Sequence, residues 1–462
     1  MVRRPSCRGD VVIEFLTVGF FVIACVLAVR DTAWALALVV SMYALEQALQ
    51  ASSGIFMRIT PLANVCVAVA AGLSVVLNLP SQDRPFRGYA TPIFSVALGF
   101  FVWAMISLLW TPAFEVAWGL TRWGIPYVIL FLMVAPLLID GMASLDRFFR
   151  AFLILGSITT ILILINPAFT VKLGRLGVDL DATVRTNPLV IGELGGLMIL
   201  VAALAPVDGS APKAVLARLV AFGLGGVLSL QSGSRGQLIF ALGLAVIAFP
   251  FARRIRNIPG FFGTVAAVVL MIPRVLFLAQ LVLGTDELRR WELTMLAGGA
   301  NTRVLNILDL FAAFANRPSA WVVGLGFNAF SWISGANKEP YSHALLVDML
   351  TELGIPAFVV FCWWSLRVLQ DGLWLLRRFG DDDYGRATAS LLMVLFVYET
   401  LLVNKQGYLW AATLFFLVGI AITRVRVREE ALDAEYAEDP GPGNGAHADV
   451  DNHHLADGRL AT

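Results

Sequence analysis

Apolar runs of about 17–25 residues follow one another along nearly the whole 462-residue chain. Each run is long enough for an α-helix to cross a bilayer, where a helix can pair all of its backbone groups internally. Hydrophobic residues make up 58% of the chain and charged residues only 15%, which excludes an ordinary soluble domain. The sequence therefore predicts an all-α, polytopic transmembrane helical bundle.

We expect about 12–13 membrane-spanning helices, at residues 11–29, 33–50, 62–79, 91–110, 122–139, 148–166, 188–205, 215–231, 235–250, 260–283, 344–368, 385–402 and 408–424. The first run lacks a small-residue cleavage site, which predicts a first span rather than a removed signal peptide. The chain then divides into N-terminal helices (1–283), one large loop (284–343), C-terminal helices (344–428) and an acidic tail (429–462). The tail is expected to be disordered and cytoplasmic.

Lys and Arg gather on the cytoplasmic side of short membrane loops. Three clusters agree with one orientation of the chain: Arg253-Arg254-Ile255-Arg256, Arg377-Arg378 and Arg424-Val425-Arg426-Val427-Arg428. This orientation puts the loop at 284–343 outside the cytoplasm. Counting back ten spans also puts the N-terminus outside, against three Arg among its first eight residues. We therefore expect one run to be miscounted, within residues 11–50.

The loop at 284–343 concentrates polar and charged residues in an otherwise apolar chain. Residues 302–316 within it have apolar side chains at three-to-four spacing, which predicts an amphipathic helix. Asn301 or Thr302 can cap its start, and Pro318 follows its end. A helix too short to span would lie against the membrane surface or the bundle, with Arg303 in its first turn.

Four motifs, taken in order, resemble those of the O-antigen ligase and polymerase superfamily. They are Gln231-Ser232-Gly233-Ser234-Arg235-Gly236, Asn301-Thr302-Arg303, the segment Asn316-Arg317-Pro318 with Gly324-Leu325-Gly326-Phe327-Asn328-Ala329-Phe330, and His343 with Glu352-Leu353-Gly354. Arg185-Thr186-Asn187-Pro188 resembles the Asn-Pro element of that superfamily. The resemblance covers about residues 90–425. The chain departs from the common pattern at Ala344, where Asn is usual, and at Asn301, where Ser is usual.

The resemblance implies a GT-C-like membrane glycosyltransferase of the bacterial inner membrane, active on the periplasmic or outer face. Its donor would be a polyprenyl-diphosphate-linked oligosaccharide, and its acceptor a hydroxyl on a glycan, lipid or protein. Both polymerisation and ligation fit this description. Besides the lipid bilayer, other polysaccharide-assembly membrane proteins are possible partners. No cofactor or metal is expected, because Arg side chains can take the place of a cation.

Displacement of a diphosphate leaves negative charge that fixed cations stabilise, most strongly where water is scarce. Arg suits this role because its planar fork binds phosphate oxygens and stays protonated. We assign Arg235 and Arg303 to the diphosphate, with Arg185 as a third candidate and the hydroxyls of Ser232 and Ser234 as helpers. The alternative for Arg235 is an interfacial Arg that snorkels to lipid headgroups; for the other two it is a solvated surface charge.

His343 is the only His outside the tail and lies at the outer mouth of a predicted span. Its imidazole can accept the proton of the acceptor hydroxyl in a single inverting displacement. It could instead bind diphosphate, orient the acceptor or bond to backbone. Glu352 and Asn187 are expected in supporting roles, with Glu352 holding an Arg; Asp348, four residues before Glu352, shares its helical face.

Several features have simpler explanations. Asp381-Asp382-Asp383 resembles a metal-binding cluster but falls on the cytoplasmic side, and the His and Asp residues of the tail have no fold around them to set coordination geometry. The net charge of +1 does not favour a nucleic-acid partner. The competing function is a transporter or flippase of a lipid-linked glycan or small solute. Such proteins usually bind at mid-membrane between repeated halves, whereas the charges here crowd one face.

Overall fold

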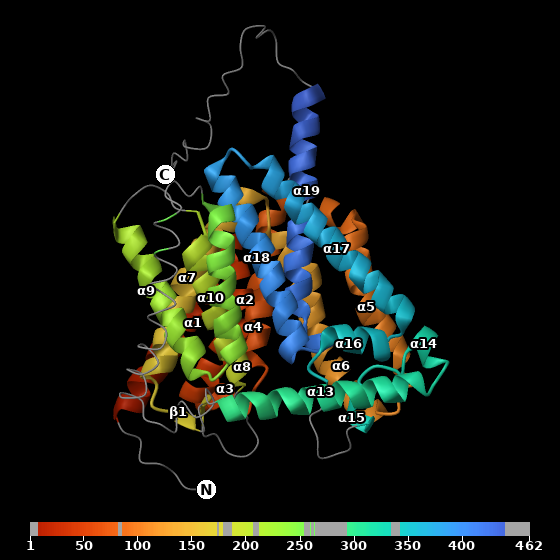
Figure 1. The fold of residues 1–462 in the computed structure, drawn as a ribbon. Helices are drawn as coiled ribbons and strands as arrows, with labels where there is room; N and C mark the ends of the chain where they lie inside the picture. Colours follow the sequence, from red (N-terminus) through yellow and green to blue (C-terminus); the bar gives the residue numbers. More distant parts are fainter. Residues whose placement is uncertain are drawn as a thin grey trace.

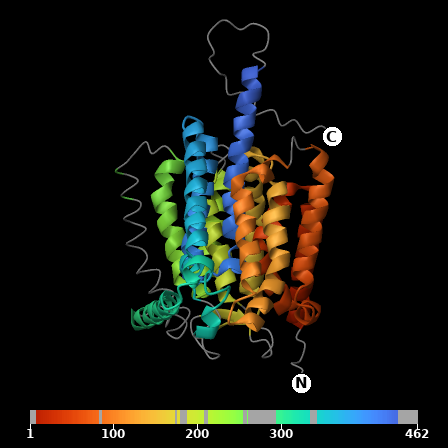
Figure 2. The same ribbon diagram turned by 90° about the vertical axis from the view of Figure 1, so that its right-hand side faces the viewer.

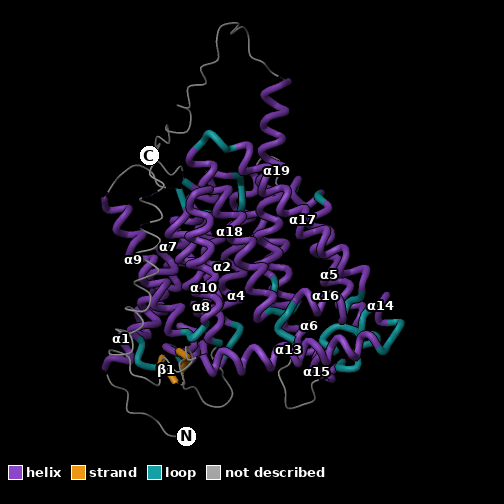
Figure 3. The backbone as a smooth tube through the Cα atoms, viewed as in Figure 1, coloured by secondary structure: helices purple, strands orange, loops and turns teal. Residues whose placement is uncertain are grey.

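The computed structural model describes residues 8–81, 86–172, 175–178, 187–206, 212–253, 259, 263, 293–333 and 342–438. Long helices stand side by side in a bundle, and connecting segments gather at its two ends (Figures 1 and 3). Seven of the described helices are long and apolar enough to cross a membrane. The arrangement is that of a polytopic helical membrane protein.

The helices of the N-terminal part are α1 (Arg8–Arg30), α2 (Thr32–Ser52), α3 (Gly54–Arg58), α4 (Leu62–Asn78), α5 (Pro92–Ser107), α6 (Phe114–Val128), α7 (Met142–Ile165), α8 (Pro188–Leu204), α9 (Pro212–Gln231) and α10 (Arg235–Ala252). Short helical turns are η1 (Leu79–Ser81), η2 (Arg87–Ala90), η3 (Ile129–Val134) and η4 (Ala135–Leu138), of which the last two extend α6. The predicted span at 260–283 lies outside the described residues, apart from residue 263.

The later helices are α13 (Leu293–Ala315), α14 (Ala320–Val323), α15 (Phe330–Ile333), α16 (Leu345–Thr351), α17 (Ile355–Arg378), α18 (Asp383–Gln406), η6 (Leu409–Ala411) and α19 (Thr413–Glu438). Trp364 of α17 is fully buried against Phe415 and Phe416 of α19, with ring centroids 5.3 and 5.1 Å away. These aromatic contacts join the last helices into one packed unit.

Helix α13 lies crosswise to the long helices at one end of the bundle, as Figures 1 and 2 show. We call this the α13 end. Leu310 and Phe314 are buried against the neighbouring short helices α14 and α15. Val304 and Leu308, from the predicted apolar face, are more than half exposed. The predicted apolar face is therefore divided: Phe314 packs on the protein, while Val304 and Leu308 face the surroundings, as on a helix at a membrane surface.

Helix α1 begins at the α13 end. The hydroxyl of Ser52, in the last turn of α2, donates to Thr17 Oγ1 of α1 at 3.2 Å and accepts from Asn166 Nδ2 at 2.9 Å. Asn166 follows α7, so three helices meet here. Helices α1 and α2 are thus two separate antiparallel helices, and the expected miscount within residues 11–50 is wrong. The charge count at the N-terminus and the later basic clusters therefore indicate opposite ends of the bundle as the cytoplasmic one.

Three further predictions need correction. The predicted span at 344–368 is broken into α16 and α17, because Gly354 adopts φ +94° between them. The all-α description omits an antiparallel hairpin, in which β1 (Phe169–Lys172) pairs with β2 (Arg175–Val178), Phe169 opposite Val178. Helix α19 continues ten residues past the predicted start of the tail, where Arg426 bonds Glu430 at 2.6 Å one turn on.

Candidate active site

Arg235 is the first residue of α10, directly after a tight turn from α9. Gly233 allows this turn because it adopts φ +67°, a backbone conformation that other residues rarely take. Ser232 Oγ donates to the Ser229 carbonyl at 2.8 Å and accepts from the Ser234 N–H at 3.2 Å. The Ser232 hydroxyl therefore holds the turn that carries Arg235.

The Arg235 turn packs tightly on the first turns of α8. A Cβ on Gly192 would lie only 2.5 Å from Ser232 Oγ and 2.9 Å from Ser234 Cβ, so no larger residue fits. Asn187 caps α8 by accepting the Leu189 N–H at 3.1 Å, with Pro188 in the first turn. The Asn-Pro element thus sets where α8 begins and how it meets the turn.

His343 lies in a second tight turn, directly before α16. Its φ of +65° is uncommon for a residue other than Gly, although His is among the residues that tolerate it. Ser342 Oγ donates to the carboxylate of Asp348 and accepts the Ala344 N–H at 3.1 Å. Ser342, Ala344 and Asp348 are all buried, and His343 is half-buried. Asp348 therefore holds the turn that presents His343.

Glu352, just after α16, is bonded to the segment of the large loop that leads into α15. Its buried carboxylate accepts the backbone N–H of Asn328 at 2.8 Å and that of Phe330 at 3.1 Å. Burial raises the pKa of Glu352 to about 7, while these two hydrogen bonds lower it. The expected Arg partner is not among the contacts of the described residues; two backbone amides take its place.

The two motifs that flank Glu352 cross with their backbones in contact. Gly324 lies against the Glu352 carbonyl and Gly354 against the Val322 carbonyl, where an added Cβ would approach within 2.0 and 2.4 Å respectively. The Leu325 N–H donates to the Thr351 carbonyl at 2.8 Å. Both Gly residues have positive φ. The crossing requires Gly at both positions, which explains the Gly residues in Gly324-Leu325-Gly326 and Glu352-Leu353-Gly354.

The last turn of α18 connects the two turns. Asn404 Oδ1 accepts the Leu346 N–H, three residues after His343, at 2.9 Å. Lys405 lies against Gly236, where a Cβ would be 2.5 Å from its Nζ. Gln406 lines a cavity described below. Three consecutive residues thus link the His343 turn, the Arg235 turn and the cavity.

A large cavity opens at the α13 end beside these turns. Its volume is about 570 Å³, and α2, α6, α8, α18 and the segment from Gly407 to Leu414 form its wall. Asn187, Glu193 and Gln406 line it. It holds three carboxyl groups, those of Glu46, Glu193 and Glu399, and none of the described residues that line it is Lys or Arg.

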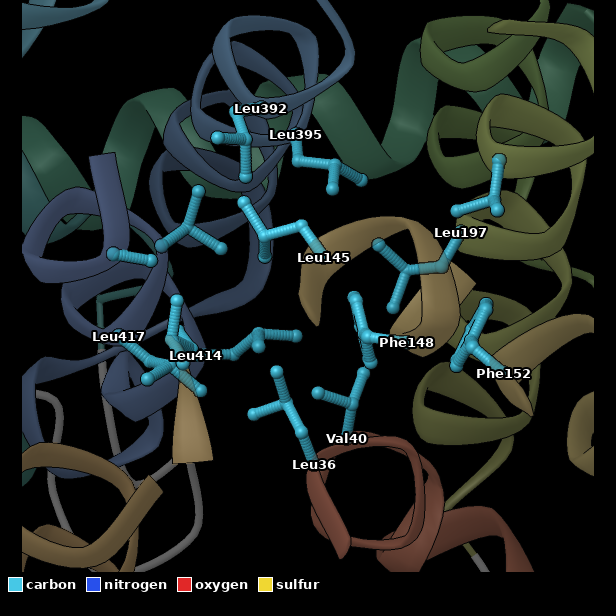
Figure 4. A pocket seen from close by; sticks show the side chains of 14 residues that line it. Leu36, Val40, Leu145, Phe148, Phe152, Leu197, Leu392, Leu395, Leu414 and Leu417 are labelled. Carbon is cyan, nitrogen blue, oxygen red and sulfur yellow. The ribbon is translucent and has the colours of Figure 1, made fainter. Parts of the chain in front are cut away.

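A small apolar cavity of about 40 Å³ lies deeper in the bundle (Figure 4). All fourteen residues that line it are apolar, and Leu36, Leu145, Phe148 and Leu395 point toward one another across it. It shares Val40 and Leu414 with the large cavity. The residues around this small cavity, which we call the apolar layer, therefore border the inner end of the polar cavity.

The predicted site residues differ in how far the structure describes them. Arg235 and His343 are at the α13 end with Ser232, Ser234, Asn187 and Glu352. Arg303 is in α13 at the same end, but its side chain is not among those described; Arg185 lies outside the described residues. Because α13 begins at Leu293, Arg303 lies in the interior of the helix and not in its first turn, and Asn301 and Thr302 do not cap its start. Lys405 was not anticipated from the sequence. Its signal is the polar stretch Asn404-Lys405-Gln406 between two apolar runs.

No protein-family model matches the chain, and no curated protein matches it.

Proposed function

We propose that this chain is a membrane glycosyltransferase of the O-antigen ligase and polymerase type. It would move a glycan from a polyprenyl-diphosphate carrier to an acceptor hydroxyl. One observation carries the proposal: the turns of Arg235 and His343, more than a hundred residues apart, both contact the last turn of α18. Polar groups that a chain brings together from distant segments at one end of a membrane bundle are typical of a functional site.

The proposed reaction is a single displacement at the anomeric carbon. The acceptor oxygen forms a bond to that carbon while the bond from the carbon to the diphosphate oxygen breaks, and the electron pair leaves with the diphosphate. Arg235 and Arg303 stabilise this negative charge, and the positive end of the α10 dipole adds to it. His343 accepts the acceptor proton. Lys405, beside Gly236, supplies a further cation.

The distribution of basic residues supports an extracytoplasmic α13 end. Arg377 and Arg378 end α17 at the opposite end, and Arg424, Arg426 and Arg428 lie in α19 near that end. Since Lys and Arg prefer the cytoplasmic side, the loop at 284–343 would face the periplasm of the bacterial inner membrane. That is the side on which lipid-linked glycans would be joined to their acceptors.

A transporter is the second candidate, because the large cavity is polar and lies within the bundle. The apolar layer of Figure 4 weighs against it. A polar solute in the cavity would have to cross Leu36, Leu145 and Leu395 to reach the opposite end, and burying polar groups without hydrogen bonds costs several kcal/mol each. The cavity instead fits a site that is entered and left from one side.

The test uses a strain that lacks its own copy of the protein and carries wild type, His343→Asn or Arg235→Ala at matched membrane abundance. Asn tolerates the positive φ of His343 but cannot act as a base, so the turn should survive. We expect each variant to lower transfer at least about a hundredfold, with carrier-linked glycan accumulating. Surface-glycan length and linkage, and the carrier-linked pool, are measured.

The matched control is Arg377→Ala, which removes an Arg from the opposite end of the bundle. It should leave glycan length and the carrier-linked pool unchanged. Normal glycan in both His343→Asn and Arg235→Ala would overturn the proposed chemistry. Carrier-linked glycan trapped on the cytoplasmic face in those variants would favour transport instead.

A further inference from the structure

The large cavity is lined by aromatic and carboxyl side chains, which binding of a diphosphate does not require. Tyr43, Trp123 and Tyr127 supply aromatic surface, while Glu46, Glu193 and Glu399 supply carboxyl groups. Its volume of about 570 Å³ lies within the range of small-molecule sites, about 300–1,000 Å³. Aromatic faces beside oxygen acceptors match a ring that has apolar faces and a rim of hydroxyls, which is the chemistry of a sugar.

Four polar atoms of its wall residues are buried and have no hydrogen-bond partner among the described residues: Gln47 Oε1, Glu399 Oε1, Gln406 Oε1 and Trp410 Nε1. Glu399 and Trp410 are each only 3% exposed. A buried polar atom without a partner is destabilising, and a ligand that supplies the partner removes this cost. Three of the four are acceptors and one is a donor, and a sugar hydroxyl can serve both because it donates and accepts.

The arrangement of Gln47 shows that these atoms are held in place rather than loose. Its Nε2 donates to the Asn187 carbonyl at 3.1 Å, so the amide is fixed by the cap of α8. Its Oε1 is the atom that has no partner in the part of the chain that the structure describes. The Gln47 side chain is therefore preorganised: its Nε2 is held by a hydrogen bond, and its Oε1 is positioned to accept one from a ligand.

The cavity is next to the proposed diphosphate site and also reaches the outside of the bundle. Gln406 in its wall directly follows Lys405, which lies against the residue after Arg235. Trp123, also in the wall, is 59% exposed. A lipid-linked molecule could therefore keep its lipid outside the bundle, its diphosphate near Arg235 and its first sugar in the cavity.

We propose that this cavity binds the sugar unit next to the diphosphate and that it selects an uncharged sugar over a uronic acid. The inference rests on the proposed function. The selectivity follows from charge: none of the described residues that line the cavity is Lys or Arg. A buried sugar carboxylate would lie beside Glu46, Glu193 and Glu399 without a cation among these lining residues to pair with, whereas an uncharged sugar needs none.

The test measures binding of two synthetic probes to the full-length protein in lipid nanodiscs, without acceptor. One is a short-chain prenyl-diphosphate N-acetylglucosamine and the other a prenyl-diphosphate glucuronic acid. We expect the neutral probe to bind at least about tenfold more tightly. Gln406→Leu should weaken the neutral probe about fivefold to tenfold, the effect of one lost hydrogen bond. Gln406→Lys should reduce the difference in affinity between the two probes, because the added Lys should bind the glucuronic acid carboxylate.

Gln370→Leu is the matched control, because it removes an exposed amide in α17 away from the cavity. It should change neither affinity. Equal affinity for the two probes, or no effect of either Gln406 variant, would overturn the inference. The inference would also be overturned if the protein bound neither sugar probe and its properties changed only when Na⁺ replaced K⁺ in the buffer. If the wild-type protein transfers glycan but binds both probes equally, only the proposed sugar selectivity is refuted. If the protein binds the neutral probe selectively but transfers no glycan in the strain assay, only the proposed enzymatic activity is refuted.

Discussion

Glu352 and Asp348 lie four residues apart and hold different parts of the same region. Glu352 accepts two backbone N–H groups of the loop, and Asp348 accepts the hydroxyl beside His343. Burial and the neighbouring Glu352 raise the pKa of Asp348. The sequence indicates that these acids are buried because they interrupt an apolar run. It does not indicate their partners, since backbone amides leave no mark in the sequence, whereas an Arg does.

Glu352→Gln should destabilise the protein by about 1.5–3 kcal/mol, because the amide can accept only one of the two N–H groups.

The Glu352→Gln variant should also show a weaker dependence of folding stability on pH. Burial raises the pKa of Glu352 from 4.5 to about 7. The folded state therefore binds more protons than the unfolded state in this window, and stability falls as pH rises through 7. Thermal unfolding at pH 5 and 8 measures both effects. Exposed Glu435→Gln should change neither, and an equal loss in that variant would contradict the assignment.

At the scale of elements, hydropathy locates the helices but not their breaks. The run at 344–368 is apolar on average despite Asp348 and Glu352, so hydropathy hides the interruption that Gly354 introduces. Helix α13 has the reverse problem. Its predicted apolar face is only partly exposed: Val304 and Leu308 are exposed, whereas Phe314 makes protein contacts together with Leu310, which was not predicted to be in that face. The last turn of α18 was missed because its polar stretch is only a few residues long, although it joins both candidate turns.

Lys405→Ala should lower glycan transfer about tenfold to a hundredfold, while Lys405→Arg should retain most of it. The reason is that Lys405 adds positive charge beside the N-terminus of α10, where charge on the leaving diphosphate develops. The strain assay of glycan length and carrier-linked intermediate measures the change. Lys213→Ala, which removes an exposed Lys from the opposite end in α9, is the matched control. Equal activity of Lys405→Ala and Lys213→Ala would mean that Lys405 only packs against Gly236.

At the scale of the whole molecule, the two ends of the bundle differ in chemistry. The α13 end has the candidate turns, the crosswise helix and the polar cavity, and the opposite end has most of the basic clusters. An apolar layer lies between them. Alternating spans predict this division in the later half of the chain. The span count extends the division to the start of the chain, whereas the charge count near α1 conflicts with the contacts among Thr17, Ser52 and Asn166.

Single cysteines in a background without Cys7, Cys25, Cys66 and Cys362 test the division directly. Arg58→Cys in α3 and Ser319→Cys before α14 are exposed at the α13 end, and Asp381→Cys is exposed between α17 and α18 at the other. In intact cells whose outer membrane has been made permeable, a membrane-impermeant maleimide should label the first two and leave Asp381→Cys unlabelled until the cells are broken. Labelling of Asp381→Cys alone would reverse the orientation and move the candidate site to the cytoplasm. Labelling of only one α13-end position would contradict the helix arrangement itself, because both lie at the same end of one packed bundle.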